Sequence, residues 1–139
     1  MRRFPAPIQQ VMSALGRLPG VGPKTALRYT FALLRLPSHE IDMIARAVAG
    51  LKSVGTCQTC FTYTEQSICD ICADPKRADN MLCVVSESRD IATLEATNAF
   101  HGKYFVLGGV LNPIEGQTPE SLRLRELHAR LEAHPEITE

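Results

Sequence analysis

The stretch Leu18-Pro-Gly-Val-Gly-Pro-Lys-Thr-Ala26 places two glycines and two prolines between apolar, helix-forming sequences. Glycine enters the left-handed backbone region at little cost and leaves neighbouring amide groups uncovered. Pro23 suits the first turn of a helix, because its φ is already helical and its missing N–H is not needed there. We therefore predict a helix, a tight turn and a second helix from about 24 to 36, with Val21 packed between the two helices.

This turn also has the features of an anion site. Backbone N–H groups of the turn and of the second helix's first residues can bind an anion. Lys24 and Arg28 are four residues apart, so they share one face of that helix. Such an arrangement holds a phosphate backbone without reading bases. The candidate DNA-binding residues are Gly20, Gly22, Lys24, Thr25 and Arg28. The alternative is a packing corner between helices that binds no ligand.

Charge is unevenly distributed along the chain, although 15 basic and 15 acidic residues cancel overall. Residues 1–39 contain six of the basic residues and none of the acidic ones. This asymmetry favours a local surface for a polyanion. A solvated basic face without a partner is the alternative.

The composition excludes several classes of protein. With 45% hydrophobic and 22% charged residues, the sequence is that of a globular protein. No apolar run approaches the ~20 residues that a membrane span needs. The basic N-terminus lacks a long apolar core and a small-residue cleavage site, so we expect no secretory signal and no membrane partner.

Apolar residues recur with helical spacing on both sides of the turn. The first helix has the positions Ile8, Val11, Met12, Leu15 and Leu18. Pro37 ends the second helix, and Ser38 is a fair N-cap for a third. The apolar face of the third helix is Ile41, Ile44, Ala45, Val48 and Leu51.

Four of the five cysteines form two Cys-x-x-Cys pairs separated by eight residues: Cys57, Cys60, Cys69 and Cys72. Each pair can direct two sulfurs to one ion from a tight turn, so the spacing favours a tetrahedral Zn²⁺ site. Four thiolates leave no open position for water, so the ion is structural, and it supplies folding energy to a segment with few large apolar residues. Two disulfides and an Fe–S cluster are the alternatives. We expect Cys83 to be a small core residue.

The last third of the chain alternates strand and helix patterns. Residues 81–85 and 104–107 are short apolar runs that predict buried strands. Residues 89–99 predict a helix between them, and Thr118-Pro-Glu120 begins another that His134-Pro135 closes. This order predicts a parallel sheet in a small α/β unit, with Tyr104 in its core.

Taken in order, these segments resemble the RecR family of bacterial recombination mediators over about residues 7–127. The resemblance rests on the hairpin Leu18–Ala26, on Cys69-Asp-Ile-Cys-Ala-Asp-Pro-Lys-Arg77, and on Leu82–Val85 with Tyr104–Gly116. It implies an α + α/β fold with three parts. These are a helix-hairpin-helix DNA-binding region (1–55), a four-cysteine zinc-finger module (56–80) and a partial Toprim domain with a Rossmann-like parallel sheet (81–139).

The resemblance further implies a function without catalysis. Members of the family bind single- and double-stranded DNA with weak sequence preference, form dimers or tetrameric rings, and work with RecO and RecF. Together these proteins help load RecA at single-stranded gaps. A cytoplasmic, nucleoid-associated location follows. DNA contacts carry over to Lys24 and Arg28, and the four cysteines carry over as the ligands of one zinc ion.

Two departures from the family pattern matter. The Toprim glutamate stands four residues before an aspartate; here Ser86 holds that place before Asp90, and the acid is Glu87. Glu87 and Asp90 are candidates for partner docking, or Glu87 is a solvated loop acid. The chain is also shorter than a usual family member, so we expect a fragment, a truncated product or a sheet that a neighbour completes. The alternative functions are a Toprim-type, Mg²⁺-dependent phosphoryl-transfer enzyme and a protein-interaction module that does not bind DNA.

Overall fold

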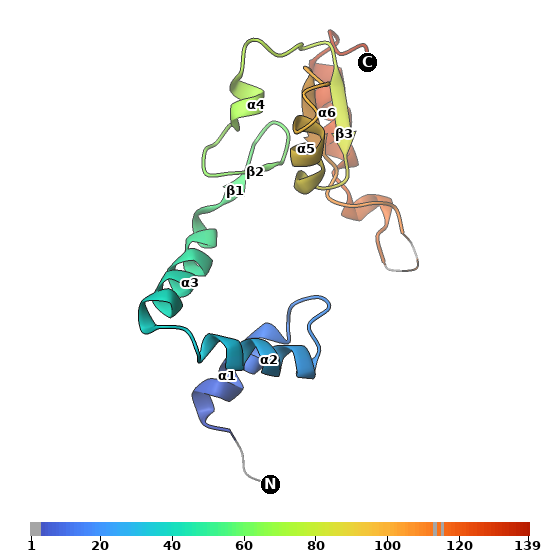
Figure 1. Cartoon of the computed structure of the whole chain (residues 1–139). Helices are drawn as coiled ribbons and strands as arrows, with labels where there is room; N and C mark the ends of the chain where they lie inside the picture. The colour runs from blue at the N-terminus through green and yellow to red at the C-terminus, as the bar shows by residue number, and fades with distance from the viewer. Residues whose placement is uncertain (1–3, 113, 115) are drawn as a thin grey trace. The chain divides into compact units, whose positions relative to one another are not determined.

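The computed structural model describes residues 4–112, 114 and 116–139 and separates them into two compact units, one ending at Leu51 and one beginning at Lys52 (Figure 1). The first unit contains α1 (Ala6–Leu15), α2 (Pro23–Leu33) and α3 (Ser38–Gly50). The short helix η1 (Leu51–Ser53) follows. The second unit contains β1 (Gly55–Thr56), β2 (Tyr63–Thr64), α4 (Asp70–Ala73), β3 (Leu82–Val85), α5 (Ser88–Glu95), β4 (Lys103–Val106), η3 (Pro119–Ser121) and α6 (Leu124–Ala133). Within the described ranges, every helix is too short or too polar to cross a membrane.

Helices α1 and α2 pack against each other around small side chains. Ala26 and Thr30 of α2 are both 2% exposed, and the Thr30 hydroxyl donates to the Ala26 carbonyl at 2.8 Å. The rings of Phe4 and Phe31 meet edge to face with centroids 5.6 Å apart. The first helix ends at Leu15, three residues earlier than its apolar pattern indicates, and Leu18 is exposed in the turn.

Helix α3 begins one residue earlier than the sequence indicates. Pro37 occupies the N-cap position and Ser38 is the first helical residue; no side chain among the described residues caps this end. The predicted apolar face is present, but it is exposed along its length. Its large side chains have exposed fractions of 39% for Ile41, 42% for Ile44, 62% for Val48 and 68% for Leu51.

The second unit has a predicted parallel sheet, and the structure confirms it. Strands β3 and β4 pair in parallel, with Leu82 opposite Lys103 and Val85 opposite Val106. Tyr104 and Phe105 are fully buried, as expected for a parallel strand covered on both faces. Helix α5 lies beside β3 (Figure 1) and contributes Ile91 to this core. The half-buried Cys83 packs against the same core.

Two helices of this unit differ from the sequence prediction. Helix α5 stops at Glu95 because Asn98 has a φ of +50° and the Thr97 hydroxyl donates to the Leu94 carbonyl, which diverts the chain into a turn. The helix expected from Thr118 is divided into η3 and α6. At the break, Leu122 is extended and buried, and the Arg123 amide donates to the Leu107 carbonyl at 3.0 Å.

A part-buried ion pair joins the segment after the cysteines to the α/β core. Arg77 donates through both terminal nitrogens to the Glu95 carboxylate, and Nη1 also reaches the Gly102 carbonyl at 3.2 Å. The Tyr104 hydroxyl donates to the same carboxylate at 2.6 Å. The hydrogen bond from Arg77 lowers the pKa of Glu95, against the opposing effect of burial. Glu95 therefore stays ionised between two donors that depend on it.

We expect Glu95→Gln to lower the free energy of unfolding of the second unit by about 2 kcal/mol, because both donors lose a charged acceptor. Urea unfolding followed by circular dichroism measures this difference. Because the folded pKa of Glu95 lies below its ordinary 4.5, the stabilisation is complete well above pH 4.5 and is lost as the pH falls through the folded value. The difference between the two proteins should therefore shrink in acid.

Glu132→Gln is the matched control, since its pair with His128 is exposed on both sides (74% and 71%). An exposed pair of this kind contributes less than about 1 kcal/mol. Equal effects of the two substitutions, or a Glu95→Gln effect that does not vary with pH, would contradict this account.

Candidate metal centre and nucleic-acid interface

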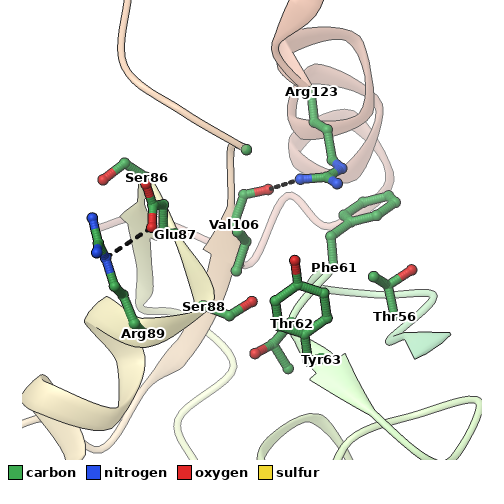
Figure 2. Close-up of a pocket in the computed structure, with 11 residues that line it drawn as sticks. Thr56, Phe61, Thr62, Tyr63, Ser86, Glu87, Ser88, Arg89, Val106 and Arg123 are labelled. Atoms are coloured by element: carbon green, nitrogen blue, oxygen red, sulfur yellow. Dashed lines mark hydrogen bonds and ion pairs between the residues drawn. The ribbon is translucent and has the colours of Figure 1, made fainter. Parts of the chain in front are cut away.

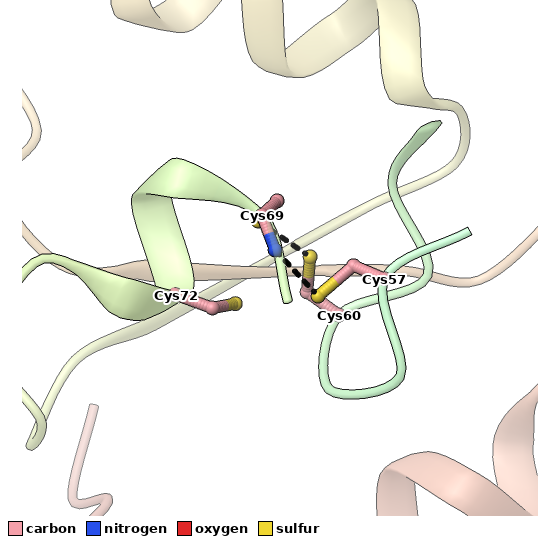
Figure 3. A group of neighbouring side chains, drawn as sticks. All are labelled: Cys57, Cys60, Cys69 and Cys72. Carbon is pink, nitrogen blue, oxygen red and sulfur yellow. Dashed lines mark hydrogen bonds between the residues drawn. The ribbon is translucent and has the colours of Figure 1, made fainter. Parts of the chain in front are cut away.

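The four predicted metal ligands lie together in the second unit (Figure 3). Cys57 and Cys60 flank a tight turn between β1 and β2, closed by the hydrogen bond from the Phe61 amide to the Cys57 carbonyl at 2.9 Å. Cys69 is the N-cap of the short helix α4, and Cys72 lies within that helix. The sequence alone did not predict the two-residue strands β1 and β2, which pair in antiparallel fashion and hold this turn.

The sulfur positions fit a tetrahedral ion. All four lie within 4.8 Å of one another, and the sulfurs of Cys60 and Cys69 are 3.6 Å apart. Zinc–sulfur bonds of about 2.3 Å place tetrahedral sulfurs roughly 3.8 Å apart. A disulfide needs about 2.05 Å between its sulfurs, and none of the five cysteines is in a disulfide, so the disulfide alternative is wrong.

The electrostatics of the thiols favour the same conclusion. Burial acts to raise the pKa of Cys57, but hydrogen bonds from the amides of Cys69, Cys60 and Thr59 outweigh it and lower the value to about 6. The pKa of Cys60 is raised, because its hydrogen bond with Cys72 and its burial favour the neutral thiol. Without a cation, four close sulfurs cannot all ionise. A divalent soft ion removes this conflict by deprotonating its ligands.

The cluster also takes the place of a hydrophobic core. Cys57, Cys60 and Cys69 are 0%, 1% and 6% exposed, and the apolar side chains packed against them are Ile68 and Ile71. The four cysteines therefore form a structural zinc site. With four protein ligands, no coordination position is open to water or substrate.

The glycine turn of the first unit has the open geometry expected of an anion site. Gly20 has a φ of +75°, whereas Gly22 is the N-cap of α2 with a φ of −80°, so only the first glycine needs the left-handed region. Both glycines face open space. Among the described residues no side chain caps α2, which leaves the amides of Lys24 and Thr25 available. Val21 is half-buried.

The side chains around this helix start are cationic. Lys24 and Arg28 are exposed, and Thr25 is half-buried beside them. The Arg28 guanidinium lies 5.4 Å from the ring centre of Tyr29, which is 44% exposed. The structure thus brings the predicted DNA-binding residues to one end of one helix, and their contact with DNA remains a prediction.

The acids predicted to dock a partner have a local structural role. Glu87 is the N-cap of α5, and its side chain accepts from the Asp90 amide, while Asp90 accepts from the Glu87 amide at 2.8 Å. The Ser86 hydroxyl also donates to Asp90 at 2.8 Å. The hydrogen bond from the Glu87 amide, with that from Ser86, lowers the pKa of Asp90. The Glu87 carboxylate pairs with Arg89 at 2.8 Å. Partner docking by these acids stays a prediction.

Sequence reasoning did not find the residue that ties α6 to the zinc turn. Nη1 of Arg130 donates to the carbonyls of Thr59 at 3.1 Å and Tyr104 at 3.0 Å. Since 71 residues separate Arg130 from Thr59, no local pattern could indicate the contact.

Family models match three successive segments of this chain. The RecR helix-hairpin-helix family model matches residues 8–51, the RecR four-cysteine zinc finger domain matches 54–74, and the Toprim domain matches 80–138.

The curated relatives include proteins named Recombination protein RecR. That of Thermosynechococcus vestitus is 41% identical over 98% of this chain and 67% of its own length. That of Gloeothece citriformis is 44% identical over 94% of this chain and 66% of its own. That of Paenarthrobacter aurescens is 46% identical over 89% of this chain and 63% of its own length. This chain therefore spans about two thirds of the length of such relatives.

We expect Cys69→Ser to lose the zinc ion and unfold the segment around β1, β2 and α4, because three thiolates and a hydroxyl hold zinc poorly. Native mass spectrometry gives the metal content, and near-ultraviolet circular dichroism reports the folding. Cys83→Ser is the control, since Cys83 lies in β3 outside the cluster. Equal zinc loss in both variants would contradict the assignment.

Proposed function

We propose that this chain, which belongs to the RecR family of recombination proteins, is a DNA-binding mediator of recombinational repair that catalyses no reaction itself. The observation that carries the proposal is the start of α2, which no described side chain caps and where amides lie beside the exposed cations Lys24 and Arg28. Free amides and cations at a helix start bind phosphate groups of any base sequence.

The charge distribution supports a polyanionic partner. No acid occurs before Glu40, so nothing in the first 39 residues repels a phosphate backbone. Binding through phosphates is independent of sequence and applies to single- and double-stranded DNA alike.

Family membership supports the wider role. In this role the chain acts with RecF and RecO to help load RecA at single-stranded gaps, in the bacterial cytoplasm and near the nucleoid. The relatives are named as recombination proteins. Glu87 and Asp90 remain candidates for docking one of these partners through their exposed surface.

The arrangement at the carboxyl end of β3 supports a role without catalysis. Metal-assisted phosphoryl transfer needs acids that converge on an ion. Here Ser86 takes the place of the Toprim glutamate, and the carboxylates of Glu87 and Asp90 are bonded to the start of α5.

The exposed apolar face of α3 supports a homo-oligomer. Three large apolar side chains on one side of this helix, with Leu51 directly after it, are exposed between 39% and 68%. A contiguous exposed apolar surface of this kind marks an interaction site. A second copy of the chain offers the same surface, as a two-fold symmetric contact requires.

We expect Lys24→Glu combined with Arg28→Glu to weaken binding to single- and double-stranded DNA at least about tenfold, because two phosphate contacts become repulsions. The slope of log affinity against log salt should fall by about two. Fluorescence anisotropy with labelled oligonucleotides at several salt concentrations measures both.

Lys76→Glu combined with Arg125→Glu is the matched control, since it makes the same change in net charge at exposed positions of the second unit. Equal losses of DNA affinity in the two double variants would show that binding depends on net charge and not on Lys24 and Arg28. Absence of DNA binding by the folded, zinc-loaded chain would favour a protein-interaction module. Mg²⁺-dependent DNA cleavage would favour an enzyme.

We expect Ile44→Glu combined with Val48→Glu to reduce the chain's mass in solution to that of a monomer, because buried charges cannot be paired across an apolar contact. Light scattering after size exclusion measures the mass. Arg46→Glu, on another side of the same helix, should leave the assembly intact. A monomeric unmodified chain would contradict the interface.

A further inference from the structure

A cavity of about 650 Å³ lies within the second unit, outside the zinc cluster and the glycine turn (Figure 2). Three parts of the fold meet there. The zinc module contributes β1 and β2, the ends of β3 and β4 contribute their carboxyl edge, and Arg123 precedes α6. The lining residues are Thr56, Phe61, Thr62, Tyr63, Ser86, Glu87, Ser88, Arg89, Val106, Gly108 and Arg123. Open α/β sheets bind ligands at this edge of their strands.

The exposed ring of Tyr63 lines the cavity, next to a well-packed Phe61. Tyr63 is 70% exposed on β2, opposite Thr56 of β1. Next to it, Phe61 is held in the left-handed region with a φ of +64°. The Phe61 ring packs against Phe105, with centroids 5.4 Å apart, and against the Arg123 guanidinium at 5.1 Å. Backbone strain at a non-glycine residue persists where the surroundings fix it.

The cavity also offers cations and hydroxyl groups. Arg89 is 81% exposed, and its Nε pairs with Glu87 at 2.8 Å, so its two terminal nitrogens have no partner within the described ranges. Nη1 of Arg123 donates a hydrogen bond to the Val106 carbonyl at 3.3 Å. Figure 2 shows the Ser88 hydroxyl directed toward the Tyr63 side of the cavity. The Glu87 carboxylate pairs with Nε of Arg89 and accepts a hydrogen bond from the start of α5.

We infer that this cavity binds single-stranded DNA, with one base stacked on Tyr63 and an adjacent phosphate paired with Arg89. Proteins that bind unpaired strands combine exposed aromatic rings with cations, since every base has a face that stacks. A duplex keeps its bases stacked on one another, so it cannot supply a base to Tyr63. With two arginines and one glutamate, the charged side chains of the lining sum to +1, which favours a nucleic acid over a basic peptide. The inference rests on the proposed DNA-binding function and adds a second contact that selects the unpaired strand.

The test compares Tyr63→Ala and Tyr63→Phe in the full, zinc-loaded chain. The probes are a labelled oligothymidylate and a labelled duplex, measured by fluorescence anisotropy. We expect Tyr63→Ala to weaken oligothymidylate binding about tenfold, as loss of one stacked base does, and to leave duplex binding unchanged. Tyr63→Phe keeps the ring and should bind as the unmodified chain does. Arg89→Gln should reduce oligothymidylate binding and lower its salt slope by about one.

Val110→Ala is the matched control, since Val110 is 67% exposed in the same unit and outside the cavity. Unchanged oligothymidylate affinity in Tyr63→Ala would overturn the inference. So would equal losses for single strand and duplex, or failure of Tyr63→Phe to restore binding. The double variant at Lys24 and Arg28 could lose binding to both single strand and duplex while Tyr63→Ala has no effect. That result would leave the proposed function intact and reject only this second contact.

Discussion

Four sulfur atoms within 4.8 Å of one another are the constraint on which the second unit depends. The segment from β1 to α4 has almost no apolar core besides these sulfurs. Other parts of the unit bond to the same turn: the Val106 amide donates to the Cys60 carbonyl at 2.8 Å, and Arg130 reaches Thr59. The metal therefore fixes a short turn that β4 and α6 both use as an anchor. A protein of this size gains stability from such a site that its apolar surface alone does not supply.

The features that sequence predicted well are those set by local spacing. The two Cys-x-x-Cys pairs define one ion site because each pair is a single turn, and the apolar runs at 81–85 and 104–107 predict strands that pair in parallel. Some of the differences from the prediction have non-local causes. Leu122 breaks an otherwise helical pattern because its side chain is buried and its neighbour bonds to Leu107. The strands β1 and β2 are two residues each and depend on the metal turn between them, so no periodicity could indicate them.

The same distinction applies to the sites. The open amides at the start of α2 follow from a proline and two glycines in sequence, and their position could be predicted. The cavity beside Tyr63 is formed by residues from Thr56 to Arg123, and only the folded chain brings them together. The uneven distribution of charge can be read from the sequence and also bears on contacts in the fold. An acid-free start of the first unit suits phosphate binding, whereas acids of the second unit are free to pair within it, as Glu95 does with Arg77.

The placement of the Tyr104 phenol against Glu95 has an optical consequence. The chain contains no tryptophan and three tyrosines, so its near-ultraviolet absorbance comes chiefly from phenol groups. Burial, followed by the hydrogen bond to Glu95, raises the pKa of Tyr104 to about 12. While the unit stays folded, this phenol resists conversion to phenolate in alkaline solution. The absorbance of phenolate thus serves as a label-free record of whether the core has opened, much as hydrogen exchange does for amides.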